Sequence, residues 1–191
     1  MARRRLLLLA LGALLLAGCA ATQRRGERAL SVGQYNDAIH LFQAVVAEEP
    51  DRLDARLGLG IALYKVGAWA DAALTLDEVL ARAPSERPAL LYRGLVAVQQ
   101  GQDAVAEDRL TRFRSSTRLP RFAAQLERAL RVLRGSGDVS ADTREFIAAS
   151  LEDVVRSARE IEEARLAVQR AYLMAYPPIH CVPTRRGWIC L

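Results

Sequence analysis

The sequence repeats with a period of 34 residues over most of its first 120 positions. The clearest series is Gly26, Gly60 and Gly94, and four more keep the same spacing: Gly33, Gly67 and Gly101; Ala38, Ala72 and Ala106; Phe42, Leu76 and Leu110; and Pro50 with Pro84. A period held by five series means that the chain is built from copies of one supersecondary unit. Such units bury their apolar faces by stacking on one another, so the sequence predicts a solenoid.

The repeated residue types resemble those of the tetratricopeptide repeat, a helix-turn-helix unit, most clearly in GQYNDAIHLFQAVVAEEP at residues 33–50. In such a unit a glycine and an alanine let the two helices cross closely, a glycine ends the first helix, and proline stops the second. The resemblance implies an all-α solenoid of about three repeats, at residues 19–52, 53–86 and 87–120. It implies a binding scaffold in general terms, because repeats of this kind serve many partners.

The N-terminus has the pattern of an exported protein. Three arginines at residues 3–5 precede the apolar run Leu6–Leu16, which is shorter than the roughly 20 residues of a membrane span and matches a signal peptide. The run ends in LAGC, residues 16–19, which resembles the lipobox of bacterial lipoproteins. The resemblance implies cleavage after residue 18, an acylated Cys19 and a lipid anchor on the periplasmic side of the envelope. The alternative is a plain signal peptide or anchor with an accidental cysteine.

Ala20 follows the expected acylated cysteine, where aspartate would retain an enterobacterial lipoprotein at the inner membrane. The resemblance therefore favours the outer membrane. Removing residues 1–18 also changes the charge, because the net charge of +5 includes three arginines of that segment. The remaining 24 basic and 22 acidic residues leave a net charge of +2, so the basic character of the chain is no argument for nucleic-acid binding.

The repeat register predicts which residues line the concave groove formed by the first helices of successive units. The predicted groove or partner-binding residues are Asp54, Leu57, Ile61, Tyr64, Leu91, Leu95 and Val98. These positions are mostly apolar, so the basic and amide clamp by which some relatives bind acidic C-termini is absent. Two interpretations stay open: the groove takes an amphipathic partner helix or apolar ligand, or the protein's own C-terminal helix fills it.

Residues 121–176 read as two further helices. The first, residues 121–134, is amphipathic and is either a capping helix or a degenerate fourth repeat. Asp142 to Glu145 resembles a capping box and starts a helix that can run to Tyr176. Its apolar residues follow steps of four and three, at Ile147, Leu151, Val154, Ala158, Ile161, Val168 and Tyr172. This pattern permits self-association as a coiled coil, or packing along the repeats of the same chain.

The tail, residues 177–191, contains HCVPTRRGWIC at residues 180–190. Zinc binding by His180, Cys181 and Cys190 lacks a fourth ligand, and a redox centre usually has Cys-x-x-Cys spacing. In an oxidising compartment a disulfide between Cys181 and Cys190 is favoured, because acylation of Cys19 leaves an even pair. Free or intermolecular thiols are the alternative.

No catalytic constellation is recognisable around the only two histidines, His40 and His180, and no phosphate-binding loop or zinc motif is present. The sequence predicts a protein without enzymatic activity, cofactor or metal. The resemblance to repeat-containing lipoproteins implies envelope proteins or peptides as partners, in envelope assembly, secretion or pilus-type machinery. The alternative is a lipoprotein that binds a small apolar ligand in its groove and works with a transporter.

Overall fold

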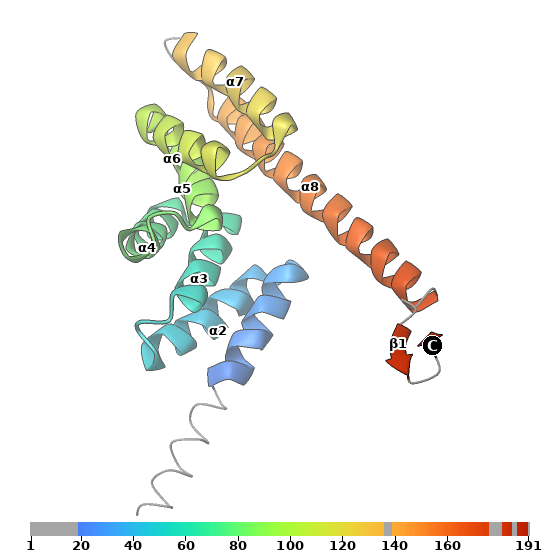
Figure 1. Ribbon diagram of the computed structural model, residues 1–191. Coiled ribbons are helices and arrows are strands. Elements are labelled where there is room, and N and C mark those ends of the chain that lie inside the picture. Colours follow the sequence, from blue (N-terminus) through green and yellow to red (C-terminus); the bar gives the residue numbers. More distant parts are fainter. Residues whose placement is uncertain (1–18, 136–138, 176–180, 185–186, 191) are drawn as a thin grey trace, which may run out of the picture. The chain divides into compact units, whose positions relative to one another are not determined.

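The computed structural model describes residues 19–135, 139–175, 181–184 and 187–190 (Figure 1). The expected signal peptide, residues 1–18, lies outside this part of the chain. The chain divides into two compact units, one ending at Leu151 and the other beginning at Glu152. We describe each unit by itself.

The first unit is a stack of helices joined by short turns, as the repeat period predicts. After a helical segment at residues 19–31 come α2 (Tyr35–Glu48), α3 (Leu53–Lys65), α4 (Trp69–Arg82), α5 (Arg87–Gln99), α6 (Asp103–Ser116), α7 (Pro120–Gly135) and the start of α8 (Ala141–Ala175). Consecutive helices from α2 to α7 pack on one another, and α3 also contacts α5. The expected all-α repeat fold is confirmed.

Glycine ends the first helix of each repeat in the conformation that the sequence predicts. Gly33, Gly67 and Gly101 have φ angles of 81°, 78° and 70°, the left-handed region that favours glycine. After each one, the next backbone N–H donates to a carbonyl five residues earlier, as from Gln34 to Ala29 at 2.9 Å. This bond satisfies a carbonyl at the helix end, so each glycine fixes both the stop and the turn.

A second glycine in each repeat allows the two helices to cross closely. A Cβ placed on Gly26 would lie 2.8 Å from Phe42, and one on Gly60 would lie 2.8 Å from Leu76. At Gly94 the distance to Cγ of Leu110 would be only 2.6 Å. Real Cβ atoms do not approach carbon so closely, so the large side chain of the second helix fills the space that each glycine leaves.

The same spacing brings the small residues of the second helices into the core. Ala38, Ala72 and Ala106 are fully buried. The prolines act as expected too, since α2 ends at Glu48, before Pro50, and α4 ends at Arg82, before Pro84.

Replacing Gly94 by valine tests the close crossing. We expect Gly94→Val to lower the free energy of unfolding by about 1–3 kcal/mol, because the added methyl groups overlap Leu110. Gly135→Val is the control, since a Cβ there would have no atom within 4 Å apart from its chain neighbours and its own helix backbone, and we expect a change within about 0.5 kcal/mol. Urea unfolding measures both, and equal midpoints for Gly94→Val and the unsubstituted protein would disprove the close contact.

The period continues into α7 and fails at α8. The first helices α3, α5 and α7 start at residues 53, 87 and 120, whereas α8 starts at Ala141, four residues later than the register of α2, α4 and α6 requires. The helix also begins differently from the predicted capping box. Ser140 Oγ accepts a hydrogen bond from the backbone N–H of Thr143 at 3.3 Å, so Ser140 caps α8 and the expected role of Asp142 is wrong. Thus α7 and α8 do not form a fourth repeat in register.

Arg144 attaches the start of α8 to the third repeat. Its guanidinium donates to the carbonyl oxygen of Val98 at 3.2 Å and to Asp103 Oδ1 at 2.5 Å. The Arg144 side chain is only 13% exposed, so this ion pair is better shielded from water than an ordinary surface pair. Ile147 and Leu151, the first apolar positions of the predicted stripe, are buried on the same part of α8.

The second unit contains the remainder of α8 and a β-hairpin. Ile161, Val168 and Tyr172 of the predicted stripe are exposed there, so a role in self-association stays a prediction. Strands β1 (Cys181–Thr184) and β2 (Gly187–Cys190) pair antiparallel. This hairpin was not predicted from the sequence, although Val182, Trp188 and Ile189 are residue types that favour strands.

Candidate functional site

The predicted groove is only partly accessible. Leu91, Leu95 and Val98 on α5 are buried, and so is Tyr64, whose ring packs edge-on against Tyr92 at a centroid distance of 5.4 Å. On α3, Leu57 and Ile61 are half-buried and Asp54 is exposed. The partner-binding role of all seven residues stays a prediction. In the described structure, however, only the α3 residues can meet a partner without rearrangement of the core.

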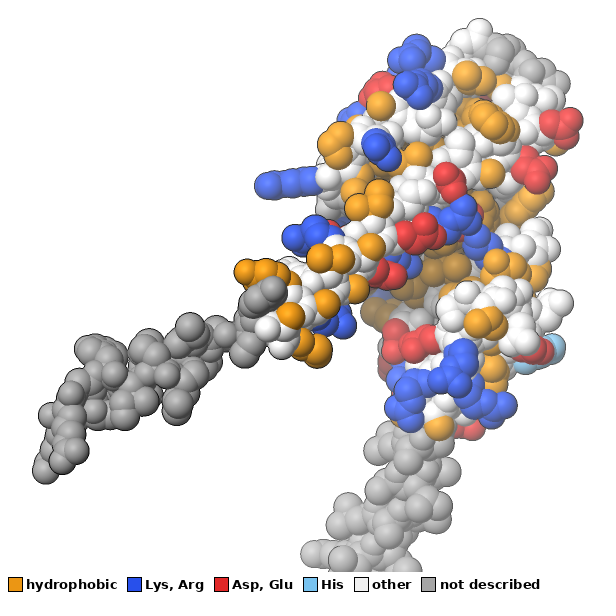
Figure 2. Space-filling model, turned by 90° about the vertical axis from the view of Figure 1, so that its right-hand side faces the viewer, with side chains coloured by type: hydrophobic (Ala, Val, Ile, Leu, Met, Phe, Trp, Pro, Cys, Tyr) orange, Lys and Arg blue, Asp and Glu red, His pale blue; other side chains and the backbone are white. Residues whose placement is uncertain are grey.

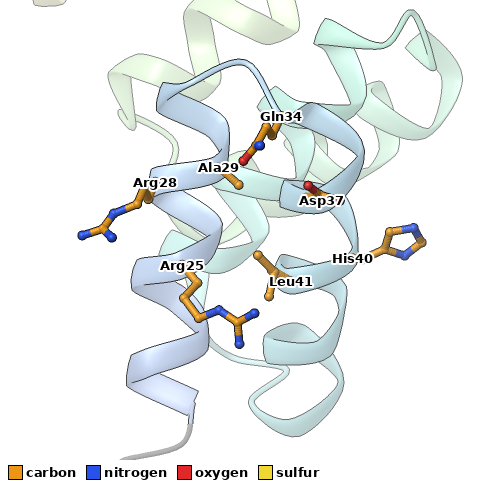
Figure 3. Close-up of a pocket in the computed structure, with 7 residues that line it drawn as sticks. All are labelled: Arg25, Arg28, Ala29, Gln34, Asp37, His40 and Leu41. Atoms are coloured by element: carbon orange, nitrogen blue, oxygen red, sulfur yellow. The ribbon is translucent and has the colours of Figure 1, made fainter.

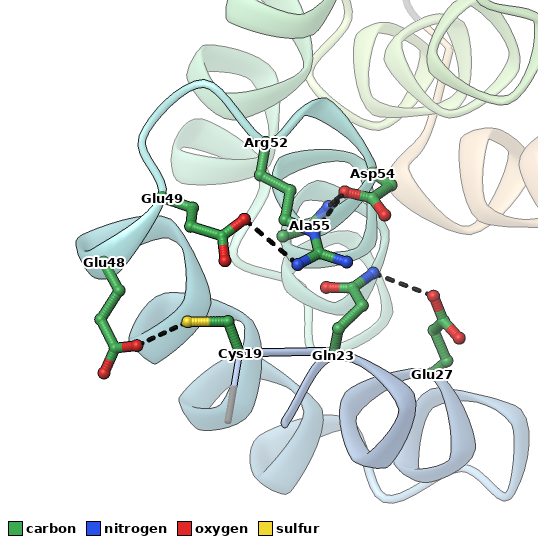
Figure 4. A network of polar contacts seen from close by, with 8 residues as sticks. All are labelled: Cys19, Gln23, Glu27, Glu48, Glu49, Arg52, Asp54 and Ala55. Carbon is green, nitrogen blue, oxygen red and sulfur yellow. Dashed lines mark hydrogen bonds and ion pairs between the residues drawn. The ribbon is translucent and has the colours of Figure 1, made fainter. Parts of the chain in front are cut away.

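Polar residues of the first repeat occupy the same register and were missed by the sequence analysis. Gln23 and Glu27 stand 34 residues before Leu57 and Ile61, so the period itself would have identified them. The amide of Gln23 is buried and donates to Glu27 Oε1 at 2.9 Å (Figure 4). Glu27 is exposed. The accessible groove therefore has an apolar wall on α3 beside a carboxylate from the first helix.

Arg52 fixes the position of the Asp54 carboxylate, the second acidic group beside the groove. Its guanidinium donates to Asp54 Oδ1 at 3.1 Å and to Glu49 Oε2 at 3.2 Å (Figure 4). The hydrogen bond to Asp54 raises the pKa of Arg52 above its ordinary value, so the guanidinium stays charged. Asp54 also accepts from the backbone N–H of Ala55 at 2.8 Å. This side chain is therefore held in one orientation at the start of α3.

Cys19 lies at the beginning of the first helical segment and turns its thiol into the protein. The Sγ atom donates to Glu48 Oε2, at the end of α2, over 2.7 Å, and the residue is buried (Figure 4). The hydrogen bond to Glu48, with further contributions from Glu49 and burial, raises the pKa of Cys19 to about 12. The thiol is therefore protonated at neutral pH and is a poor nucleophile. Acylation of Sγ would remove this donor and require the side chain to leave its buried position.

A hollow of about 570 Å³ lies between the first helical segment and α2 (Figure 3). It is lined by Arg25, Arg28, Ala29, Gln34, Asp37, His40 and Leu41. His40 is exposed, and its side chain points away from the hollow in Figure 3. The walls of this open hollow carry both signs of charge, from Arg25 and Arg28 and from Asp37.

Comparison with known proteins identifies the repeats. Residues 29–97 match the family described as tetratricopeptide repeat. Over this segment the chain is therefore similar to tetratricopeptide repeats. The matched residues include two of the three turn glycines, Gly33 and Gly67, and the complete second repeat. Tetratricopeptide arrays are protein-interaction scaffolds whose concave face is lined by the first helix of each repeat.

One similar solved structure is described as the TPR2B-domain:pHsp70-complex of yeast Sti1. The TM-score is 0.49 at 12% sequence identity, and the likeness covers 69% of this chain and 96% of that one. No curated protein sequence matches this chain.

The described residues contain no group of three or more histidine, cysteine, aspartate or glutamate side chains that could hold a metal ion. His180 lies outside the described residues, so the zinc alternative is not addressed by this finding. Over the ranges that the structure describes, no helix has both the length and the hydropathy of a membrane span.

The hairpin register places the two tail cysteines opposite each other. Cys181 pairs with Cys190, and Thr184 pairs with Gly187 beside the two-residue connection at residues 185–186. The pair next to such a connection is hydrogen-bonded and pair types alternate, so the cysteines form a non-hydrogen-bonded pair. Cα atoms of such pairs are about 4.5 Å apart, within the range that a disulfide spans. The backbone thus permits the predicted disulfide.

A trypsin digest tests that disulfide. We expect cleavage after Arg185 or Arg186 to leave the two halves of the tail joined, because Cys181 and Cys190 lie on opposite sides of the cut. Mass spectrometry before and after reduction measures the linkage. Cys190→Ser is the matched control and should separate the halves without reductant. Separate halves in the unreduced natural chain would show that the thiols are not paired with each other.

Proposed function

We propose that this protein is a lipid-anchored interaction scaffold on the periplasmic side of the bacterial cell envelope. In this proposal the chain is cleaved after residue 18, Cys19 carries the lipid, and the tetratricopeptide repeats bind an envelope protein or peptide. The accessible part of the groove carries the proposal: half-buried Leu57 and Ile61 lie on α3, with exposed Glu27 in the same register of the neighbouring first helix. The outer membrane is favoured over the inner membrane because Ala20 follows Cys19.

The chemistry of this surface indicates the kind of partner. Leu57 and Ile61 are one helical turn apart, so together they offer an apolar strip to an amphipathic helix or an extended peptide. Asp54 and Glu27 place negative charge beside the strip, and of the two only Asp54 is paired with an arginine among the described residues. We therefore expect the bound segment to combine apolar residues with a lysine or arginine that faces Glu27.

Photocrosslinking in native membranes tests this surface. A photoreactive phenylalanine analogue at position 61 should give a discrete protein adduct, because half-buried Ile61 is a predicted groove residue. The same analogue at position 74 is the control, since Leu74 is exposed on the second helix α4. Leu57→Arg should abolish the adduct at position 61, whereas Leu74→Arg should leave it unchanged. Circular dichroism melting checks that both arginine variants remain folded.

Two outcomes would contradict the proposed function. Identical adducts at positions 61 and 74 would mean that the groove has no specific partner. An adduct at position 61 with the mass of a lipid or a small molecule would favour the alternative of a ligand-binding lipoprotein.

A further inference from the structure

Three arginines gather on one exposed face of the first helical segment. Arg24, Arg25 and Arg28 fall within about 100° of the helix circumference, and all three are exposed. We call these three residues the arginine face. Among the residues that the structure describes, none of the three guanidiniums has a hydrogen-bond or ion-pair partner. Figure 2 shows basic side chains gathered at the end of the first unit where the described chain begins.

The same positions are mostly interior in the later repeats. One period after Arg25 and Arg28, Leu59 and Ala62 are buried, and two periods after Arg28, Val96 is buried. Arg93, two periods after Arg25, is also buried, and it donates to Asp77 of the preceding repeat at 3.0 Å.

The first repeat has no preceding repeat in the described residues. The arginine face therefore lies at the end of the array. It occupies the positions through which a later repeat contacts the repeat before it. A terminal repeat needs a polar outer face for solubility. Here the three charges on that face have one sign, and none has a partner among the described residues.

The hollow beside the arginine face does not account for these charges. Figure 3 shows Arg28 pointing away from α2, while Arg25 reaches toward the gap between the helices. Asp37 belongs to the opposite wall and would repel an anion inside the hollow. Arg28 therefore offers its positive charge away from the hollow, and the exposed Arg25 lies at its edge.

We propose that the arginine face binds the anionic lipid headgroups of the membrane in which the protein is anchored. The proposal rests on the proposed function through the lipid on Cys19. Arg24 and Arg28 follow Cys19 by five and nine residues, which is about 8 and 14 Å along a helix. The anchor thus holds the arginines near the layer of lipid phosphates, to which guanidinium groups bind with paired N–H donors. This contact adds an electrostatic attraction to the hydrophobic attachment by the lipid, and it orients the repeats on the membrane.

Arginine modification in reconstituted vesicles tests the contact. The full protein, produced in bacteria with its own leader, is reconstituted with phosphatidylethanolamine plus either anionic phosphatidylglycerol or zwitterionic phosphatidylcholine. Phenylglyoxal then modifies accessible arginines, and mass spectrometry gives the rate at each position. Arg118, Arg121 and Arg131 are the internal control, because they are exposed and have no partner among the described residues. Flotation of the vesicles reports membrane attachment separately.

We expect modification of the arginine face to be about fivefold slower in the phosphatidylglycerol vesicles, from the attraction of each arginine to an anionic surface. High salt should remove this protection, and the control arginines should react equally in both vesicles. Equal rates for the arginine face in both kinds of vesicle would overturn the proposal. They would mean that these arginines only contact water at the end of the array. Protection in native membranes, with no protection in vesicles that contain no other protein, would also overturn the proposal. That result would indicate that an acidic protein binds the arginine face.

The flotation result separates this proposal from the proposed function. Attachment to both kinds of vesicle without selective protection would support the anchor and reject the headgroup contact. Salt-sensitive attachment to phosphatidylglycerol vesicles alone would support the arginine face and contradict the anchor. Failure to float with either kind of vesicle would contradict both.

Discussion

The contact between a glycine of one helix and a large side chain of the next determines how the repeats are built. Gly26 meets Phe42, Gly60 meets Leu76 and Gly94 meets Leu110, each across 16 positions of sequence. Because no Cβ stands between them, the helices of one unit approach closely, and the turn glycine after the first helix sets the direction of return. The rest of the first unit depends on this crossing, because each later repeat packs on the surface that it creates.

Stacking has different consequences in the middle of the array and at its first repeat. Positions that face the preceding repeat become interior, as Ala62 and Val96 are, and a charge there requires a partner such as the one Asp77 provides for Arg93. The first repeat has no such neighbour in the described residues, and arginines occupy these positions. One repeat pattern thus yields a packed interior and a basic end beside Cys19.

Sequence reasoning was strongest where a constraint is local and periodic. The turn glycines, the crossing glycines and the buried alanines could all be predicted because their spacing fixes their place in the unit. The accessibility of Leu91, Leu95 and Val98 could not be predicted, because burial depends on side chains distant in sequence. The N-cap of α8 was predicted at the wrong residue because Ser140 and Asp142 are both residue types that cap helices well. In the structure Ser140 is the cap. The hairpin was missed because its strands are short and one of them contains a proline.

In the proposed function, the repeat array begins directly at the lipid anchor. The first helical segment begins at Cys19 in the described structure, so an anchor there leaves no flexible linker between lipid and repeats. The mass of the protein isolated from bacterial membranes tests this claim most directly. We predict an N-terminal peptide that begins at Cys19 and carries the additional mass of a diacylglycerol. A chain that retains residues 1–18, or one that begins elsewhere with an unmodified Cys19, would contradict the proposed lipid anchor.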